Sequence, residues 1–279
     1  VQQNNELEHK EQRLQEQNQA ILDSITYASR IQHAILPSLD AVRRLAPDTY
    51  VYYRAKDIVS GDFYWSWQQG STLYFAAIDC TGHGVPGAFM TVVGHSLLNQ
   101  IVIEDGLQEP GEILHELDRR VRLVLQQDDP SSPNTEDGMD MAFIRLNTET
   151  RELAYSGAHR DLYYLLPDGQ TPEDLHTLKA ARAPIGGTLY TKGKDYPNHT
   201  VQLPAGTQVY MYSDGIPDQM GGDRGRKFSN KRLQALMVSL AEEPDANRDH
   251  ILDKALRDWQ GAEYPQTDEL LFVDIKVPE

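Results

Sequence analysis

Several features are scarce in this 279-residue sequence, and each scarcity excludes a class of protein. Cys80 is the only cysteine, so no disulfide can form within the chain, which is compatible with a reducing cytoplasm. No apolar run approaches the length of a membrane span, and the opening Val1-Gln2-Gln3-Asn4 lacks the character of a signal peptide. Lys and Arg total 26 against 42 Asp and Glu, and this net charge of −16 argues against nucleic acid or an anionic membrane as the main partner.

The first part of the sequence differs from the rest. Residues 1–32 contain no proline or glycine and are rich in Gln, Glu, Asn and Lys. Apolar residues recur there at intervals of seven, at Leu7, Leu14, Ile21, Ala28 and Ile35. This spacing favours a dimeric coiled coil over residues 1–36, and a long helix packed on its own domain is the alternative. The apolar stripe widens toward its end, so we expect the stretch Ile31–Leu36 to pack on the following domain.

Pro37 ends this helix, and residues 37–279 form one globular domain by length. Apolar, β-prone runs predict strands at Thr49–Ala55, Phe63–Trp67, Leu73–Ile78, Met139–Leu146, Glu152–Ser156, Leu162–Leu166, Asp195–Leu203, Thr207–Tyr212 and Leu270–Val277. Helices are predicted at Pro86–Ile103, Glu112–Gln126, Lys231–Leu240 and Arg248–Trp259. The polar segment Gln127–Gly138 predicts a loop, and Pro167-Asp168-Gly169 a hairpin turn. Without strict strand–helix alternation, this order favours a layered α+β domain over a Rossmann-like sheet.

Four aspartates lie where apolar runs meet turns. They are Asp62 in Ser60-Gly61-Asp62-Phe63, Asp79 in Asp79-Cys80-Thr81-Gly82-His83-Gly84, Asp214 in Ser213-Asp214-Gly215, and Asp268 in Thr267-Asp268-Glu269. Any one of them alone is best explained as a turn or cap residue. Together, acidic residues at several strand ends can converge in space, where they repel unless cations neutralise them. Hard oxygen ligands favour Mg²⁺ or Mn²⁺, so the set predicts a two-metal centre.

In their order and context, these motifs resemble those of the metal-dependent serine/threonine protein phosphatases, the PPM superfamily, and most closely its bacterial SpoIIE/RsbU-like branch. Two further segments are similar to that branch, Ser156-Gly157-Ala158-His159 and Ala183-Pro184-Ile185-Gly186. The resemblance implies a four-layer α-β-β-α sandwich with two central antiparallel sheets, with the metals between the sheets at one edge. A heptad-rich helix often links an upstream sensor to the phosphatase in that branch, which agrees with residues 1–36.

The resemblance also implies roles for single residues. Asp79 would bridge two Mn²⁺ or Mg²⁺ ions, and the backbone carbonyl of Cys80 would bind one of them. Asp62 would lie on the side of the second ion, and Asp214 and Asp268 would complete the shell of the first. A water activated by both ions would attack phosphorus, so no Ser or Cys nucleophile is needed. His83 is a candidate proton donor to the leaving oxygen, although a structural role, with its ring bonded to the turn backbone, is favoured.

Charged residues outside the four aspartate motifs are further candidates for the site. Asp140 is a candidate for a further metal ligand, although a hydrogen bond at the start of a strand is favoured. Lys56 and Arg54 are candidates to bind phosphate, although exposed surface charge is favoured for both. The pair His159–Arg160 is expected at a turn between strands.

The leading functional hypothesis is a metal-dependent phosphoserine/phosphothreonine phosphatase in bacterial signalling. By resemblance, its substrate is a phosphorylated anti-anti-sigma-type regulator, and the chain is a cytoplasmic output fragment of a larger sensor protein that dimerises through its N-terminal helix. A catalytically silent module of the same fold that binds a partner protein is the alternative. A metal nuclease also uses clustered carboxylates, but the acidic balance disfavours it.

Overall fold

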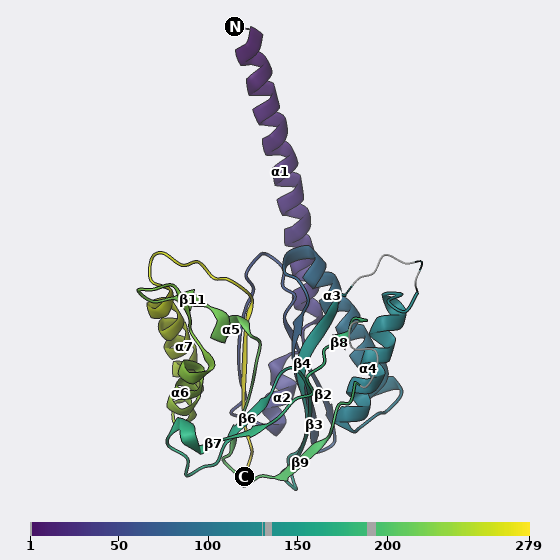
Figure 1. Ribbon diagram of the computed structural model, residues 1–279, viewed down its shortest axis with the longest axis vertical. Coiled ribbons are helices and arrows are strands. Elements are labelled where there is room, and N and C mark those ends of the chain that lie inside the picture. The colour runs from purple at the N-terminus through teal and green to yellow at the C-terminus, as the bar shows by residue number, and fades with distance from the viewer. Residues whose placement is uncertain (1, 130, 132–135, 189–193) are drawn as a thin grey trace.

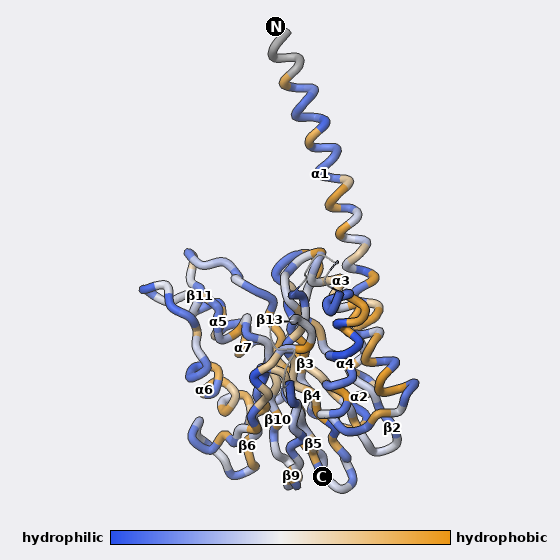
Figure 2. Tube along the Cα trace, turned by 45° about the vertical axis from the view of Figure 1, so that its right-hand side comes forward, coloured by the Kyte–Doolittle hydropathy of each residue, from blue (hydrophilic) through white to orange (hydrophobic). Residues whose placement is uncertain are grey.

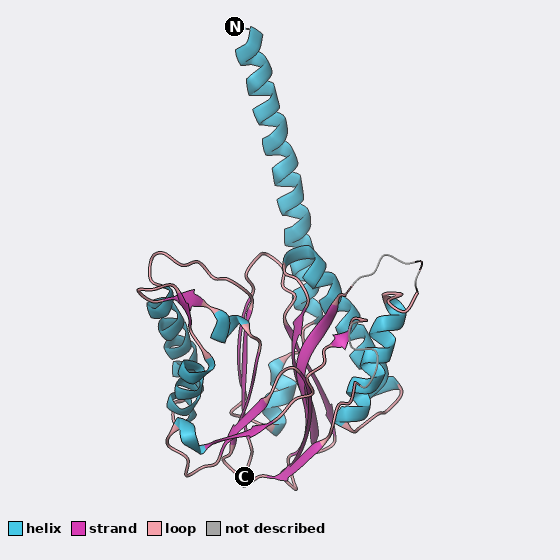
Figure 3. Ribbon diagram, in the orientation of Figure 1, coloured by secondary structure: helices cyan, strands magenta, loops and turns pink. Residues whose placement is uncertain are grey.

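Two antiparallel sheets packed face to face form the centre of the molecule, with helices on both outer faces (Figures 1 and 3). The computed structural model describes residues 2–129, 131, 136–188 and 194–279. The first sheet has the strand order β1 (Tyr50–Arg54), β13 (Leu270–Lys276), β10 (Gln208–Tyr212), β6 (Leu162–Leu165), β7 (Leu175–Leu178). The second has the order β2 (Phe63–Gln69), β3 (Thr72–Cys80), β4 (Gly138–Asn147), β5 (Glu152–Ala158), β9 (His199–Gln202), and β8 (Ile185–Gly186) pairs with β4.

Three apolar layers hold this sandwich together. Between the sheets, side chains such as Phe75, Tyr155 and Val273 are fully buried. Outside the second sheet, α3 (Gly84–Leu98), the π-helix η1 (Asn99–Glu104) and α4 (Pro110–Val124) close a second layer. Outside the first sheet, α6 (Asn230–Ala241) and α7 (Asp245–Gln260) close the third. The predicted four-layer α-β-β-α architecture is therefore confirmed.

Short elements complete the chain. They are α2 (Leu39–Leu45), the 3₁₀ turn η2 (Pro172–Asp174), α5 (Gly215–Asp218), and the paired β11 (Met220–Gly221) and β12 (Arg226–Lys227). The strand predicted over Asp195–Leu203 is wrong in its first half, because only His199–Gln202 pairs with β5. Tyr196 instead turns its ring into the core, and Asn198 accepts a hydrogen bond from the Gly111 N–H (2.7 Å).

The connection after β6 is also longer than predicted. Gly169 N–H donates to the Leu166 carbonyl (2.9 Å), so a turn forms at the predicted place. The chain then passes through η2 before β7 pairs with β6, and β7 was not predicted from the sequence. A two-residue hairpin loop is therefore absent from this connection.

One helix also departs from the expectation about membrane-spanning runs. The continuous helical stretch Gly84–Glu104, α3 with η1, is long and apolar enough to cross a membrane by length and composition alone, so that expectation was wrong on this criterion. In the fold, 44% of this stretch is buried, and Leu98 and Ile101 are fully covered by the second sheet and α4. Its apolar composition is accounted for in part by this core position.

The N-terminal helix α1 (Gln2–Ile35) projects from the domain (Figure 1). Hydrophobic positions recur along its otherwise polar length (Figure 2), and Leu7, Leu14 and Ile21 are 60%, 57% and 57% exposed. At its C-terminal end, Gln32 is buried and Leu36 packs against the layer under α3, whereas Ile31 stays 49% exposed. The predicted packing of this end on the domain is thus observed for Gln32 and Leu36 but not for Ile31.

Candidate metal centre

The four predicted aspartates come from both sheets. Asp62 directly precedes β2, and Asp79 is the penultimate residue of β3 in the second sheet. Asp214 follows β10 and occupies the N-cap position of the short helix α5 without a side-chain capping hydrogen bond, while Asp268 lies two residues before β13 in the first sheet. Because antiparallel neighbours β10 and β13 place the end of one strand beside the start of the next, residues far apart in sequence meet at one end of the sandwich.

A cavity of about 290 Å³ lies at this end. Its walls include the predicted residues Asp79, Cys80, His83, Asp214 and Asp268. They also include Thr81, Gly82, Glu136, Gly138, Met139, Asp140, Arg160 and Pro184. Asp62 is not among the residues that line the cavity. It is only 3% exposed and lies close to Asp79.

Asp140 belongs to this site, contrary to the role favoured from the sequence. It is the direct cross-strand partner of Asp79 in the β3–β4 ladder, so both side chains lie on the same face of the sheet. Its carboxylate contacts the ring Nδ1 of His159 (2.9 Å) and the guanidinium of Arg160 (3.3 Å). These are contacts between side chains across the site, not a hydrogen bond that starts the strand.

Arg160 is the residue that the sequence did not indicate. It lies in the turn between β5 and β6, as expected, and its Nη2 donates to Asp79 Oδ2 (2.6 Å) and to Asp214 Oδ2 (2.7 Å). Its side chain is 16% exposed, and these carboxylates raise the pKa of its guanidinium although burial opposes this. Arg54 and Lys56 are not among the residues that line the cavity, and Arg54 pairs instead with Asp253 (3.5 Å).

Burial dominates the electrostatics of the acidic residues. Burial raises the pKa of Asp62 well above its usual value, with a further contribution from the charge of Asp79. Burial likewise raises the pKa of Asp79 to about 7, although Arg160 opposes the shift. Within the described residues, Asp62 Oδ2 is buried with no hydrogen-bond partner. A buried carboxylate oxygen without a partner is costly, and a bound cation would remove that cost.

Glu269 is a second residue that the sequence analysis missed. It is 2% exposed, and its Oε1 accepts a hydrogen bond from the backbone N–H of Gly61 (3.3 Å). Burial and a hydrogen bond with Asp268 raise its pKa to about 7. Glu269 therefore ties the segment before β13 to the segment that carries Asp62. Its position next to Asp268 was the available signal.

His83 and Cys80 occupy the cavity wall in different ways. His83 precedes α3, and its ring Nδ1 lies 2.9 Å from Asp57 Oδ2, so the favoured hydrogen bond to the turn backbone is not observed. The Cys80 side chain is buried, and burial raises the pKa of its thiol well above the usual value. A protonated, buried thiol is a poor nucleophile, which agrees with the expectation that no thiol chemistry is used.

Close backbone packing fixes the segment that carries Asp62. A Cβ added at Gly87 in α3 would lie 2.4 Å from the Gly82 carbonyl oxygen and 2.8 Å from the Gly61 Cα. Only glycine allows the helix to approach this closely. The Thr91 hydroxyl contacts the carbonyl oxygens of Ser60 (3.1 Å) and Gly61 (3.0 Å).

The end of α1 reaches the same segment. The buried Gln32 side chain accepts a hydrogen bond from Ser60 N–H (3.0 Å) and donates to the Ser60 carbonyl. The N-terminal helix is thus bonded directly to the tripeptide that ends in Asp62.

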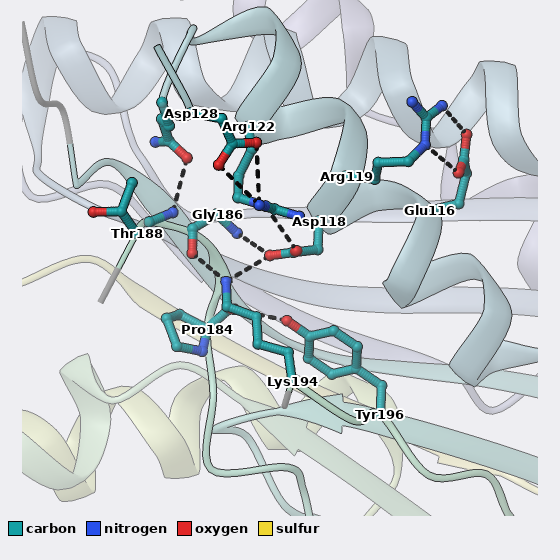
Figure 4. Close-up of polar contacts among 12 residues, drawn as sticks. Glu116, Asp118, Arg119, Arg122, Asp128, Pro184, Gly186, Thr188, Lys194 and Tyr196 are labelled. Atoms are coloured by element: carbon teal, nitrogen blue, oxygen red, sulfur yellow. Dashed lines mark hydrogen bonds and ion pairs between the residues drawn. The ribbon is translucent and has the colours of Figure 1, made fainter. Parts of the chain in front are cut away.

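A buried polar network supports the part of the cavity wall formed by Gly138 and Met139. Lys194 Nζ lies 2.6 Å from both Asp118 Oδ1 and the Gly186 carbonyl oxygen, and Gly186 N–H donates to Asp118 Oδ1 (2.8 Å) (Figure 4). The side chains of Asp118 and Lys194 are each 7% exposed. Gly186 belongs to β8, which pairs with Gly138 and Met139 at the cavity. The network therefore connects α4 to the strand start that precedes Asp140.

The donor chemistry of the site agrees with a hard divalent cation, although the ligands are not assembled. Among the residues that the structure describes, no three His, Cys, Asp or Glu side chains are arranged to hold a metal ion. A cationic guanidinium already lies among three of the carboxylates, and Asp62 Oδ2 has no hydrogen-bond partner in the part of the chain that the structure describes. These carboxylates are the oxygen ligands that Mg²⁺ and Mn²⁺ prefer, so the residues present suit such ions.

Comparison with known proteins identifies the family of this chain. The family model for stage II sporulation protein E (SpoIIE) matches residues 69–278. The SiaA PP2C domain of Pseudomonas aeruginosa is 31% identical in sequence, and its structure superposes with a TM-score of 0.81 over 93% of this chain and 98% of that one. A search of curated protein sequences found no match.

Two more distant structures share the fold. A Mycobacterium tuberculosis chain with RsbU and RsbW domains has 20% identity and a TM-score of 0.64, covering 83% of this chain and 60% of that one. The PP2C phosphatase domain of SpoIIE from Bacillus subtilis, with a fragment of its regulatory domain, has 18% identity and a TM-score of 0.62, covering 83% and 61%. The match over residues 69–278 and the likeness to the SiaA domain show that the chain belongs to the SpoIIE family of PP2C-type phosphatases.

Proposed function

We propose that this chain hydrolyses phosphoserine and phosphothreonine esters in a protein substrate, with Mn²⁺ or Mg²⁺ as cofactor. One observation carries the proposal: both sheets of a PP2C fold deliver aspartates to one cavity, Asp79 from one sheet and Asp214 and Asp268 from the other, with Asp62 buried beside them. Divalent metal ions are general cofactors of PP2C phosphatases.

The proposal assigns metal binding to four carboxylates and one backbone carbonyl. Asp62, Asp79, Asp214 and Asp268 would hold the ions, together with the backbone carbonyl of Cys80. When bound, two such ions neutralise the charge of the phosphate ester and lower the pKa of the water that attacks phosphorus. The thiol of Cys80 takes no part, because it is buried and its pKa is raised.

A role on the leaving group is supported for His83 by two observations. The residue lines the cavity, and its ring Nδ1 contacts Asp57 Oδ2 (2.9 Å) just before α3. A serine or threonine alkoxide requires a proton as it departs, directly or through water. We assign that proton transfer to His83 as part of the proposal.

The partner and regulatory assignments extend this proposal. We expect a phosphorylated anti-anti-sigma-type regulator as substrate, a cytoplasmic location and a homodimer formed through α1. The positions Leu7, Leu14 and Ile21 support a partner helix, because more than half of each apolar side chain is exposed. A protein substrate is supported by the regulatory setting of related proteins, such as the chain that combines RsbU and RsbW domains.

A phosphate-release assay tests the proposed activity. The chain is incubated with an aryl phosphate and with phosphoserine peptides, in EDTA and then in added Mn²⁺ or Mg²⁺. We expect phosphate release that requires the metal and is lost in Asp79→Asn, while circular dichroism shows that this variant remains folded. Absence of turnover in the folded, metal-supplemented protein would refute the proposal.

A silent signalling module of the same fold is the second candidate. The contact of Arg160 with Asp79 and Asp214 favours it, because a guanidinium at these oxygens leaves them unavailable to a metal. A folded protein that binds no Mn²⁺ in calorimetric titration, yet still binds a partner protein, would establish this function instead.

A further inference from the structure

The guanidinium of Arg160 is surrounded by carboxylates from three separate elements. Its Nη2 lies 2.6 Å from Asp79 Oδ2 in β3, 2.7 Å from Asp214 Oδ2 after β10, and 3.3 Å from Asp140 Oδ2 in β4. Within the described residues, its Nε is buried and has no hydrogen-bond partner. The head group is therefore held mainly through one nitrogen, and only the charge of the acids compensates for its burial.

These contacts use oxygens that the proposed metal centre needs. Asp79 Oδ2 and Asp214 Oδ2 each face Arg160 Nη2, and an oxygen that accepts such a short hydrogen bond cannot at the same time approach a divalent ion closely without bringing two cations together. In a partly buried site the repulsion between the ion and the guanidinium is weakly screened. Arg160 and a divalent ion would therefore compete for these two oxygens.

The side chain has a place to which it can move. A second hollow of about 290 Å³ adjoins the metal cavity, and Arg160 and Asp214 line both. The remaining walls of this hollow are mostly polar, with Asp161, Tyr212 and Asn230 among them. Arg160 can thus leave the carboxylates by rotating its side chain within the turn between β5 and β6, without any change in the sheets.

We propose that Arg160 is a built-in counter-cation of the acidic site, which neutralises Asp79, Asp140 and Asp214 in the metal-free protein and is displaced when a divalent ion binds. The inference rests on the proposed function, since it takes these carboxylates to be metal ligands. Arg160 then sets metal affinity by competition and stabilises the metal-free fold.

The variant Arg160→Met tests the competition, because it removes the charge and keeps much of the length of the side chain. We expect calorimetry to show Mn²⁺ binding at least about tenfold tighter than in the wild type, and thermal denaturation in EDTA to show a lower melting temperature. Arg160→Lys keeps a cation and should bind Mn²⁺ with nearly wild-type affinity.

Arg145→Met is the matched control. Arg145 also pairs with two carboxylates, Glu109 (2.7 Å) and Glu152 (3.3 Å), and its side chain is 20% exposed, but none of these residues lines the metal cavity. This variant should destabilise the fold without changing Mn²⁺ affinity. Wild-type or weaker Mn²⁺ affinity in Arg160→Met would overturn the inference, whereas a wild-type protein that binds no Mn²⁺ would overturn the metal centre as well.

A measurement on the wild-type chain avoids reliance on variants that fail to fold. In protein labelled with ¹⁵N-arginine, the Nε–Hε resonance of Arg160, assigned by its absence in Arg160→Lys, should shift and sharpen as Mg²⁺ saturates the site. The resonance of Arg145 should not change. An Arg160 resonance that remains constant while calorimetry shows Mg²⁺ bound would overturn the inference.

Discussion

At the scale of single residues, the site depends on which face of a strand a side chain occupies. Asp79 was predicted as a ligand because four aspartates lie where apolar runs meet turns and because of the family resemblance, and the β3–β4 register adds Asp140 on the same face. Glu269 was missed because a buried carboxylate beside a predicted ligand has no motif of its own. Arg160 could not be predicted, because its position among three carboxylates depends on the meeting of β3, β4 and β10, which are far apart in sequence.

The first prediction concerns the bridging residue. Asp79→Asn replaces a carboxylate by an amide with one acceptor oxygen and no charge. We expect phosphatase activity to fall at least about 100-fold and calorimetry to show both metal sites weakened. Asp48→Asn, on the surface, should change neither. Metal binding of unchanged stoichiometry and affinity in Asp79→Asn would show that this carboxylate bridges nothing.

Cys80 allows a contrasting prediction. Its side chain is buried, and its proposed contact is made by the backbone carbonyl. We therefore expect Cys80→Ala to cost about 1 kcal/mol of unfolding free energy, for lost packing, and to leave metal affinity unchanged. Calorimetric titration and urea denaturation of the same sample measure both quantities. Loss of metal binding with the fold intact would point to the thiol.

At the scale of secondary-structure elements, the sequence predicted long, apolar elements well and short ones poorly. Strands β3, β10 and β13 are buried runs bounded by Asp, Ser and Gly, and local composition identifies them. The two-residue strand β8 has no such pattern, because its pairing with β4 depends on Asp118 and Lys194, which belong to distant segments. The same dependence on distant partners explains why the strand predicted over Asp195–Leu203 does not form at Tyr196.

The Asp118–Lys194 pair leads to a prediction at this scale. Lys194→Met leaves Asp118 with Arg122 Nε (3.1 Å) and the Gly186 N–H as partners, so we expect it to reduce the free energy of unfolding by about 1–3 kcal/mol, measured by urea denaturation. The double variant Asp118→Leu with Lys194→Met should lose less than the sum of the two single variants, since each single variant already removes the contact between the two side chains. Lys254→Met, in an exposed pair with Asp258, should cost less than about 1 kcal/mol. Additive losses at Asp118 and Lys194 would show that the two charges act independently.

At the scale of the whole molecule, most of α1 projects from the domain, and its apolar heptad positions are exposed. The heptad positions were predicted from spacing alone, and their exposure agrees with a partner outside the chain. That this partner is a second copy of the chain is part of the proposal. The heptad spacing predicts an apolar stripe that packs against another helix, but it does not identify that helix.

The apolar heptad stripe of α1 leads to a prediction about the dimer. Leu14→Lys with Ile21→Lys places two charges at exposed apolar positions, so light scattering should report monomers and phosphate release should change although no metal ligand is altered. Gln12→Lys with Gln19→Lys adds two positive charges away from the heptad positions and should remain dimeric. Dimers that persist in the first variant would exclude the coiled-coil interface, and monomers with wild-type turnover would remove its regulatory role.

The bond between Gln32 and Ser60 has a mechanical consequence. A helix of 34 residues is about 50 Å long, and this bond lies roughly one turn from its fixed end. A sideways push at the free end therefore reaches Ser60 as a displacement reduced about tenfold, as at the short arm of a lever. Torque about the helix axis is not reduced with distance, because a stiff rod turns through the same angle along its whole length. Rotation of α1 about its axis would therefore reach Ser60 with its angle unchanged, whereas sideways motion of the free end would reach it with its amplitude reduced.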